Sequence, residues 1–271
     1  MSIGISLHCI IATLAYTAYA GQMEEHILQE RRERVFFILA GFFICAMTLL
    51  NVVGITRFVQ LGPMQLAVGV LPYPLTFLCT DLICELYGRA RATFVVSVGL
   101  ALNFFILAIL WLGASLPAVP AEIMPPWQVL QLAETLTLPS GENIEGHIEL
   151  FQLIYQCTAG AVFASMMAYI AAQYADVRLF HFWKRLTRGK HLWLRNNFST
   201  LISQGVDSIM VISITFGATY LAGDIAFKAM LVLMGSNYLF KMFVALMDTL
   251  PFYFLVARLK RYLQIDNLAV D

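Results

Sequence analysis

Long apolar runs, separated by short charged stretches, occupy most of this chain. Six runs are each long enough to cross a bilayer as an α-helix, because about 20 residues at ~1.5 Å per residue span the hydrocarbon core. They cover roughly residues 35–56, 62–87, 93–116, 150–175, 199–222 and 229–257. The pattern therefore predicts an all-α, polytopic integral membrane protein with six core transmembrane helices.

The first twenty residues form a further apolar run whose role the sequence leaves open. They end in Ala18-Tyr19-Ala20, which resembles a signal-peptidase site, but no Lys or Arg precedes the run as a signal peptide would require. A seventh span and an interfacial helix are both compatible with this segment. We divide the chain into this segment with its polar lead-in (1–34), a six-helix domain (35–260) and a tail (261–271).

Composition supports a membrane location, since 60% of the residues are hydrophobic and only 13% are charged, against about 25% charged in a soluble domain. The five cysteines form no C-x-x-C pair, so neither a metal site nor a disulfide framework is predicted. The chain also lacks the H-E-x-x-H, G-x-S-x-G and P-loop motifs. We therefore expect no enzymatic activity, no cofactor and no metal.

Basic residues are distributed unevenly between the two sides of the membrane. If the six spans alternate in direction, 14 of the 17 Lys and Arg residues fall on one side, whereas the 117–149 loop on the other side has five Glu and no Lys or Arg. The positive-inside rule then places the C-terminus in the cytoplasm. We expect the protein to lie in the inner (cytoplasmic) membrane. The basic loop between the fourth and fifth spans also contains aromatic residues, which we interpret as lipid contacts rather than a nucleic-acid interface.

Few ionisable residues remain at membrane depth: Asp81, Glu85, Asp207, Lys241 and Asp248. Such residues are costly in a bilayer and commonly face a cavity or a partner. Asp81 and Glu85 lie one helical turn apart on one face. Lys241 could pair with Asp207 or Asp248 and simply hold the fifth and sixth spans together. Glu85 could likewise form an ion pair with one of the arginines that follow the second span.

Two prolines, Pro72 and Pro74, interrupt the second predicted span and remove backbone donors there. Interrupted helices often mark the binding site of a carrier, although a plain kink is the alternative. Tyr73 and Phe77 flank the break, and Phe77 lies one turn before Asp81. An aromatic face beside a carboxylate could stack a flat ring while the acid accepts its N–H donors.

Four separate segments resemble the queuosine precursor transporter family, which is also described as vitamin-uptake-transporter-like. They are Tyr73-Pro-Leu-Thr-Phe-Leu-Cys-Thr-Asp81 running on to Glu85-Leu-Tyr-Gly88; residues 164–173 with Asp176; residues 190–200 with Gln204 and Asp207; and Lys241 with Asp248-Thr-Leu-Pro251. The last motif differs slightly from the Asp-Thr-Pro of the family. The resemblance covers about residues 35–260 and leaves the N-terminal segment and the 117–149 loop outside it.

The resemblance implies six helices, one interrupted at Pro72 and Pro74, and uptake of 7-deazaguanine precursors of queuosine, namely the 7-cyano or 7-aminomethyl compound. A guanine-like edge presents adjacent N–H donors that a carboxylate accepts in a bidentate pair, and amides suit its carbonyl and ring nitrogens. The expected substrate-binding residues are Asp81, Glu85, Asp207, Gln204, Phe77, Tyr73 and Asn51, with Lys241 and Asp248 in a supporting ion network.

The expected partners are a small 7-deazapurine and the lipid bilayer, and a homodimer is an arrangement that the sequence leaves open. Two alternatives also stay open. The chain could carry another flat vitamin or nucleobase, or it could be a non-transporting membrane scaffold in which Gln204 and Asn51 only join helices.

Overall fold

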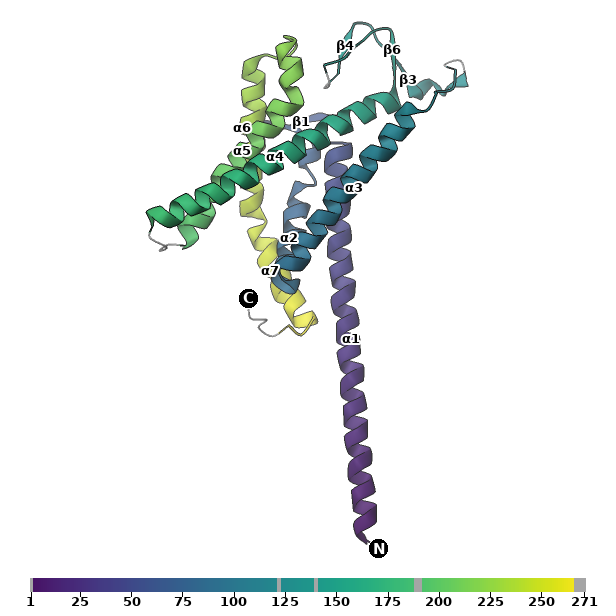
Figure 1. Ribbon diagram of the computed structural model, residues 1–271, viewed down its shortest axis with the longest axis vertical. Coiled ribbons are helices and arrows are strands. Elements are labelled where there is room, and N and C mark those ends of the chain that lie inside the picture. Colours follow the sequence, from purple (N-terminus) through teal and green to yellow (C-terminus); the bar gives the residue numbers. More distant parts are fainter. Residues whose placement is uncertain (1, 121–122, 139–140, 188–191, 266–271) are drawn as a thin grey trace.

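The computed structural model describes residues 2–120, 123–138, 141–187 and 192–265 (Figure 1). The described part is mostly helical, and six of its segments are long and apolar enough to cross a membrane. This confirms the predicted fold class. The helices are α1 (Ser2–Val52), α2 (Tyr73–Tyr87), α3 (Arg89–Ser115), α4 (Leu150–Leu186), α5 (Leu192–Leu221), α6 (Phe227–Met247) and α7 (Thr249–Tyr262).

The six apolar spans alternate in direction, with α6 and α7 together forming the last of them, so the bundle has two distinct ends (Figure 1). At one end α2 turns into α3 at Gly88, whose φ of 86° is readily adopted only by glycine. The end of α7 lies at the same end, where the Arg32 guanidinium of α1 donates to the carbonyls of Leu263 and Gln264. We call it the basic end. The opposite end carries the paired strands of the 117–149 loop (Figure 1), and we call it the hairpin end.

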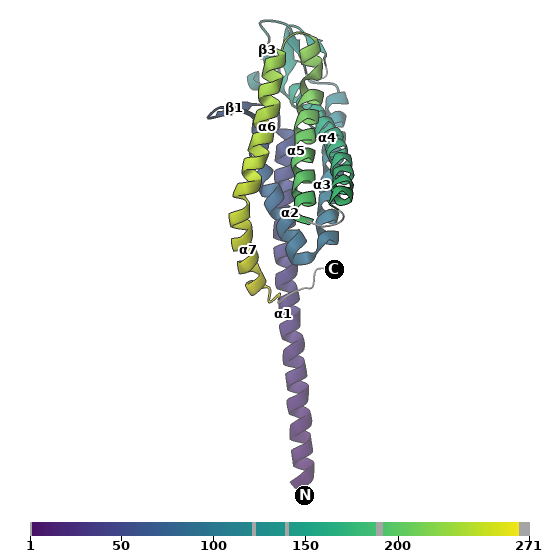
Figure 2. The ribbon, with the colours of Figure 1, turned by 90° about the vertical axis from the view of Figure 1, so that its left-hand side faces the viewer.

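Apolar side chains hold the bundle together in several small clusters rather than in one large core. Phe43 of α1, Ile83 of α2 and Val95 of α3 are buried in one cluster. Ile212 of α5 packs against Met230 and other side chains of α6 in a second. Helix α5 lies between α4 and α6 (Figure 2). The bundle is therefore built so that α5 can present polar side chains toward both α6 and α2.

The second span is shorter than predicted. Residues 62–67, expected to be helical, belong to an antiparallel hairpin of β1 (Phe58–Leu61) and β2 (Met64–Ala67), followed by a 3-10 turn, η1 (Val68–Val70). Gly62 has a φ of 58° in the two-residue turn. This backbone conformation is typical of tight hairpin turns and does not occur inside an α-helix. Pro72 and Pro74 do interrupt the apolar run, but they do so by starting α2, since the first turn of a helix needs no N–H partner.

The sixth span, predicted as one uninterrupted helix, is divided at Asp248 into α6 and α7. Pro251 has no N–H to donate to the carbonyl of Met247, so one helical hydrogen bond is missing at this point. The Asp248 carbonyl accepts from Phe252 N at 3.0 Å, and the chain continues in nearly the same direction. The break is a local opening of the helix backbone at membrane depth.

Helix α1 is also longer than expected, because no helix end separates the apolar N-terminal segment from the first span. It contains 51 residues and projects well beyond the basic end of the bundle (Figures 1 and 2). The predicted polar lead-in is helical, with charged pairs such as Arg34–Glu30 along it. The residues before it continue α1 away from the bundle.

The 117–149 loop is folded at the hairpin end. A 3-10 turn, η3 (Pro126–Gln128), precedes β3 (Val129–Gln131), which pairs with β6 (His147–Glu149), while β4 (Leu136–Thr137) pairs with β5 (Asn143–Ile144). Leu138 and Ile148 are buried. These apolar side chains explain why a polar loop of this length adopts a defined shape.

Candidate functional site

Three helices bring a compact set of polar and aromatic side chains together inside the bundle. The set consists of Tyr73 and Phe77 from α2, Gln204 and Asp207 from α5, and Lys241 from α6, and we call it the α2–α5–α6 cluster. Lys241 forms an ion pair with the Asp207 carboxylate. The Tyr73 hydroxyl donates to Gln204 Oε1 at 3.2 Å. Residues that are more than 120 positions apart in the sequence thus meet at one place.

The aromatic part of the cluster is ordered by the start of α2. Tyr73 is the first residue of the helix, and the N–H of Leu75 and the hydroxyl of Thr76 bond the nearby carbonyls of Pro72 and Tyr73. The rings of Tyr73 and Phe77 meet edge to face, with centroids 4.5 Å apart and an interplanar angle of 88°. Such geometry is favourable for aromatic pairs, so the proline start of α2 places a rigid aromatic corner against α5 and α6.

In the charged part of the cluster, Lys241 is buried and Asp207 is partly buried. Lys241 is 6% exposed, and its ammonium lies 5.1 Å from the centroid of the Tyr73 ring, within the range of a cation–π contact. The Asp207 side chain is 22% exposed. The sequence allowed Lys241 to pair with either Asp207 or Asp248, and the structure shows the pairing with Asp207.

Two other predicted residues, Asp81 and Asp248, lie next to the cluster along α2 and at the α6–α7 break. They are close enough to interact electrostatically with each other. Asp248 Oδ2 is buried and has no hydrogen-bond partner among the residues that the structure describes. The Asp81 side chain is more exposed. This pair adds negative charge one helix turn or more beyond the aromatic corner.

Glu85 and Asn51 lie apart from the cluster. Glu85 forms an ion pair with Lys260 of α7 at the basic end, where both side chains are more than one third exposed. Asn51 donates to the Met47 carbonyl at 3.1 Å and accepts from the Ser165 hydroxyl at 3.4 Å, so it joins α1 to α4. The structure therefore brings five predicted residues, Lys241 among them, into the cluster. It places Asp81 and Asp248 beside the cluster and leaves Glu85 and Asn51 elsewhere.

One buried polar side chain in this region was not singled out from the sequence. Ser208 follows Asp207 directly and is 1% exposed, and its hydroxyl has no partner among the described residues. Its position four residues after Gln204 places both on one face of α5. The same spacing in the sequence could have indicated it.

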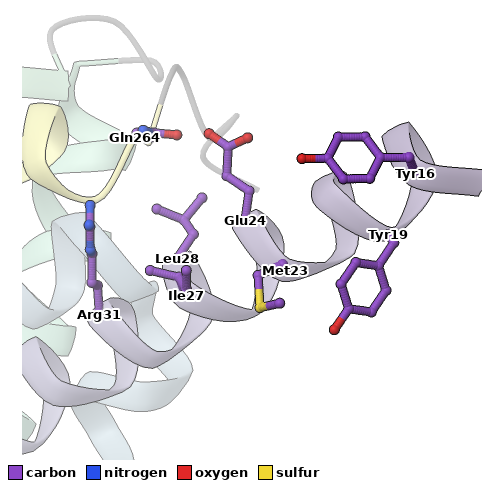
Figure 3. Close-up of a pocket in the computed structure, with 8 residues that line it drawn as sticks. All are labelled: Tyr16, Tyr19, Met23, Glu24, Ile27, Leu28, Arg31 and Gln264. Atoms are coloured by element: carbon purple, nitrogen blue, oxygen red, sulfur yellow. The ribbon is translucent and has the colours of Figure 1, made fainter. Parts of the chain in front are cut away.

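A groove on the described surface lies away from all of these residues. It has a volume of about 520 Å³ and is lined by Tyr16, Tyr19, Met23, Glu24, Ile27, Leu28, Arg31 and Gln264 (Figure 3). Figure 3 shows that it runs along the projecting part of α1 beside the end of the described chain. None of the predicted site residues borders this groove.

A multi-pass helical protein with ionisable and aromatic side chains gathered between its spans, beside interrupted helices, has the construction of a membrane solute carrier. Comparison with known families gives the same class. Residues 67–256 match the family described as "Putative vitamin uptake transporter", and the chain belongs to this family. The matched region contains the whole cluster. No curated protein and no solved structure matches the chain.

Proposed function

We propose that the chain imports 7-deazaguanine precursors of queuosine and binds them at the α2–α5–α6 cluster. The observation that supports this most directly is the Tyr73–Phe77 corner, which faces Gln204 and Asp207 of α5. A flat base can stack on an aromatic side chain, which contributes about 1–3 kcal/mol per base in other nucleobase sites. The proposal also rests on the four sequence motifs and on membership of the transporter family.

Each polar group of the cluster has a counterpart on such a base. A carboxylate, Asp81 or Asp207, accepts the two adjacent N–H donors of the guanine-like edge. The Gln204 amide can donate to the ring carbonyl while its oxygen accepts a further N–H. Since Gln204 Oε1 and the Asp207 carboxylate are occupied by Tyr73 and Lys241, binding requires these contacts to rearrange.

We further propose that the basic end faces the cytoplasm and that its contacts in this structure close it. The Glu85–Lys260 ion pair joins α2 to α7 there, and the Tyr87 hydroxyl donates to the Arg32 carbonyl of α1 at 2.8 Å. Opening this end would release a base that entered from the hairpin end. The positive-inside rule supports this orientation.

Salvage in cells tests the proposed function. A bacterial strain that cannot synthesise the precursor, and lacks its own importer, is given the full chain and an external 7-deazaguanine precursor. Queuosine in its tRNA should be restored by the wild type. Gln204→Ala and Asp207→Asn variants should restore much less at equal membrane abundance, whereas Thr135→Ala in the 117–149 loop should behave as the wild type does. No restoration by the wild type would contradict the proposal.

The family description favours one alternative, uptake of another flat vitamin. Competition separates the two: an excess of unlabelled purines or vitamins should not reduce uptake of a labelled 7-deazaguanine. If a vitamin competes better than the unlabelled precursor does, that vitamin is the substrate. A scaffold predicts instead that the Asp207→Asn change alters abundance and never accumulation.

A further inference from the structure

Lys241 occupies a binding place for an alkylammonium group. Its ammonium is held by the Asp207 carboxylate on one side and lies over the face of the Tyr73 ring, 5.1 Å from the centroid. A carboxylate and an aromatic face together are the groups by which proteins bind organic ammonium ions. The same two groups could hold an ammonium group that belongs to a ligand.

The charges at membrane depth leave room for a second cation. Within the described parts of the second, fifth and sixth spans, Asp81, Asp207 and Asp248 lie away from the bundle ends, and Lys241 is the single cation among them. The Glu85 carboxylate is already paired with Lys260. Uncompensated carboxylates inside a membrane protein are costly, so a ligand that brings a positive charge is favoured over a neutral one.

Asp248 offers a place for Lys241 if it leaves Asp207. The two residues are seven positions apart and share a face of the sixth span. Asp248 Oδ2 is buried and has no hydrogen-bond partner in the described chain. The missing helical hydrogen bond at Pro251 lies beside it. An ammonium displaced from Asp207 would therefore have a second carboxylate further along the same span.

We propose that the Asp207–Tyr73 pair is the subsite for an ammonium arm of the substrate, and that Lys241 is displaced from it toward Asp248 when substrate binds. The chain then selects a flat base that carries a short alkylammonium arm. This deepens the proposed function: of the two precursors, the 7-aminomethyl compound binds more tightly than the 7-cyano compound. Lys241 is a specificity-determining residue because it competes with the arm.

The test uses the full chain in proteoliposomes and measures how well each unlabelled compound displaces bound, labelled 7-cyano-7-deazaguanine, a readout that variants with slow transport also give. The two compounds differ only in the arm. The wild type should bind the aminomethyl compound about tenfold or more tightly, as one charge-assisted contact predicts. Lys241→Met should increase this preference, since it removes the ammonium that competes with the arm for Asp207 and Tyr73.

Asp207→Asn should abolish the preference. Because either single change leaves a charge without its partner, the double variant Lys241→Met/Asp207→Asn is measured as well, and it should bind both compounds equally. Lys228→Met, at the start of the same helix, is the matched control and should retain the wild-type preference. Equal affinities in the wild type, or selective loss of the aminomethyl compound in Lys241→Met, would overturn the inference while the proposed function stands. If neither compound is transported, both fail.

Discussion

The Lys241–Asp207 ion pair is the feature whose energetics is easiest to test. Breaking a buried pair by removing one partner costs about 3–5 kcal/mol, because the remaining charge is left uncompensated, whereas replacing both partners can be nearly neutral. We therefore expect Asp207→Asn to lower the thermal midpoint strongly and Lys241→Met/Asp207→Asn to recover most of it. Thermal unfolding in detergent for the wild type, both single variants and the double variant gives the coupling energy. Additive losses would show that the pair does not stabilise the bundle.

The Tyr73 hydroxyl should contribute less to substrate uptake than the Tyr73 ring does. Tyr73→Phe removes the hydrogen bond to Gln204 and keeps the aromatic corner, so we expect a loss of about 1 kcal/mol in stability. Tyr73→Ala removes both, and uptake should fall much further. Initial-rate uptake by the two variants, with the exposed Tyr169→Phe as a control, measures the difference. Equal defects in Tyr73→Phe and Tyr73→Ala would mean that the ring has no part in binding.

Side-chain chemistry in the sequence predicted which residues would be important better than it predicted their partners. Gln204 and Asp207 share a face of α5, and this follows from their spacing alone. Whether Lys241 reaches Asp207 or Asp248 depends on how α5 and α6 are rotated against each other, which no local pattern contains. The same reason applies to Asn51, a buried polar residue that contacts α4 and not the cluster.

Among the helices and their connections, the contact between the end of α1 and η1 leaves no space for a side chain at Gly69. The Gly69 N–H donates to the Gly54 carbonyl at 3.0 Å, and a Cβ atom added to Gly69 would lie 2.5 Å from Gly54 Cα and 2.6 Å from the Leu50 carbonyl oxygen. Both obstacles are backbone atoms, so Gly69→Ala must separate the two segments. We expect a clear fall in thermal midpoint and reduced uptake, since η1 leads directly into α2.

Gly217→Ala is the matched control for this change, because nothing lies within 4 Å of the added methyl group. It should leave stability unchanged or raise it by up to about 1 kcal/mol, as expected for alanine in a helix interior. Circular dichroism of both variants in the same detergent makes the comparison. If Gly69→Ala proves as stable as Gly217→Ala, the close approach of η1 to α1 is not part of the folded bundle.

The helix ends show where hydropathy stops being informative. Residues 62–67 are apolar enough for a span, yet they form β2 and its turn because Gly62 and the two prolines favour a hairpin and a helix start. In the sixth span one proline was enough to divide α6 from α7, although the apolar pattern runs through it. Apolar length predicts how much chain crosses the membrane, while glycine and proline decide where each helix begins.

The whole molecule has a strong asymmetry of charge between its two ends. The basic end carries Arg32, Arg91 and Lys260, whereas the 117–149 loop at the hairpin end carries Glu and no Lys or Arg. Six alternating spans follow from composition alone, and the structure agrees with this number. The straight continuation of α1 past the bundle cannot be predicted from composition, because a polar stretch such as residues 21–34 can equally form a turn or a helix.

The orientation of the bundle gives the last prediction. Single cysteines are introduced at Thr135 in the 117–149 loop and at Glu25 on the projecting part of α1, both exposed, in a variant whose five native cysteines are replaced. If the basic end is cytoplasmic, a maleimide that cannot cross the inner membrane should label Thr135→Cys from the outer side, and Glu25→Cys only after that membrane is disrupted. The reverse labelling pattern would show that the orientation is opposite to the one proposed. The closed basic end would then face the side from which the substrate arrives.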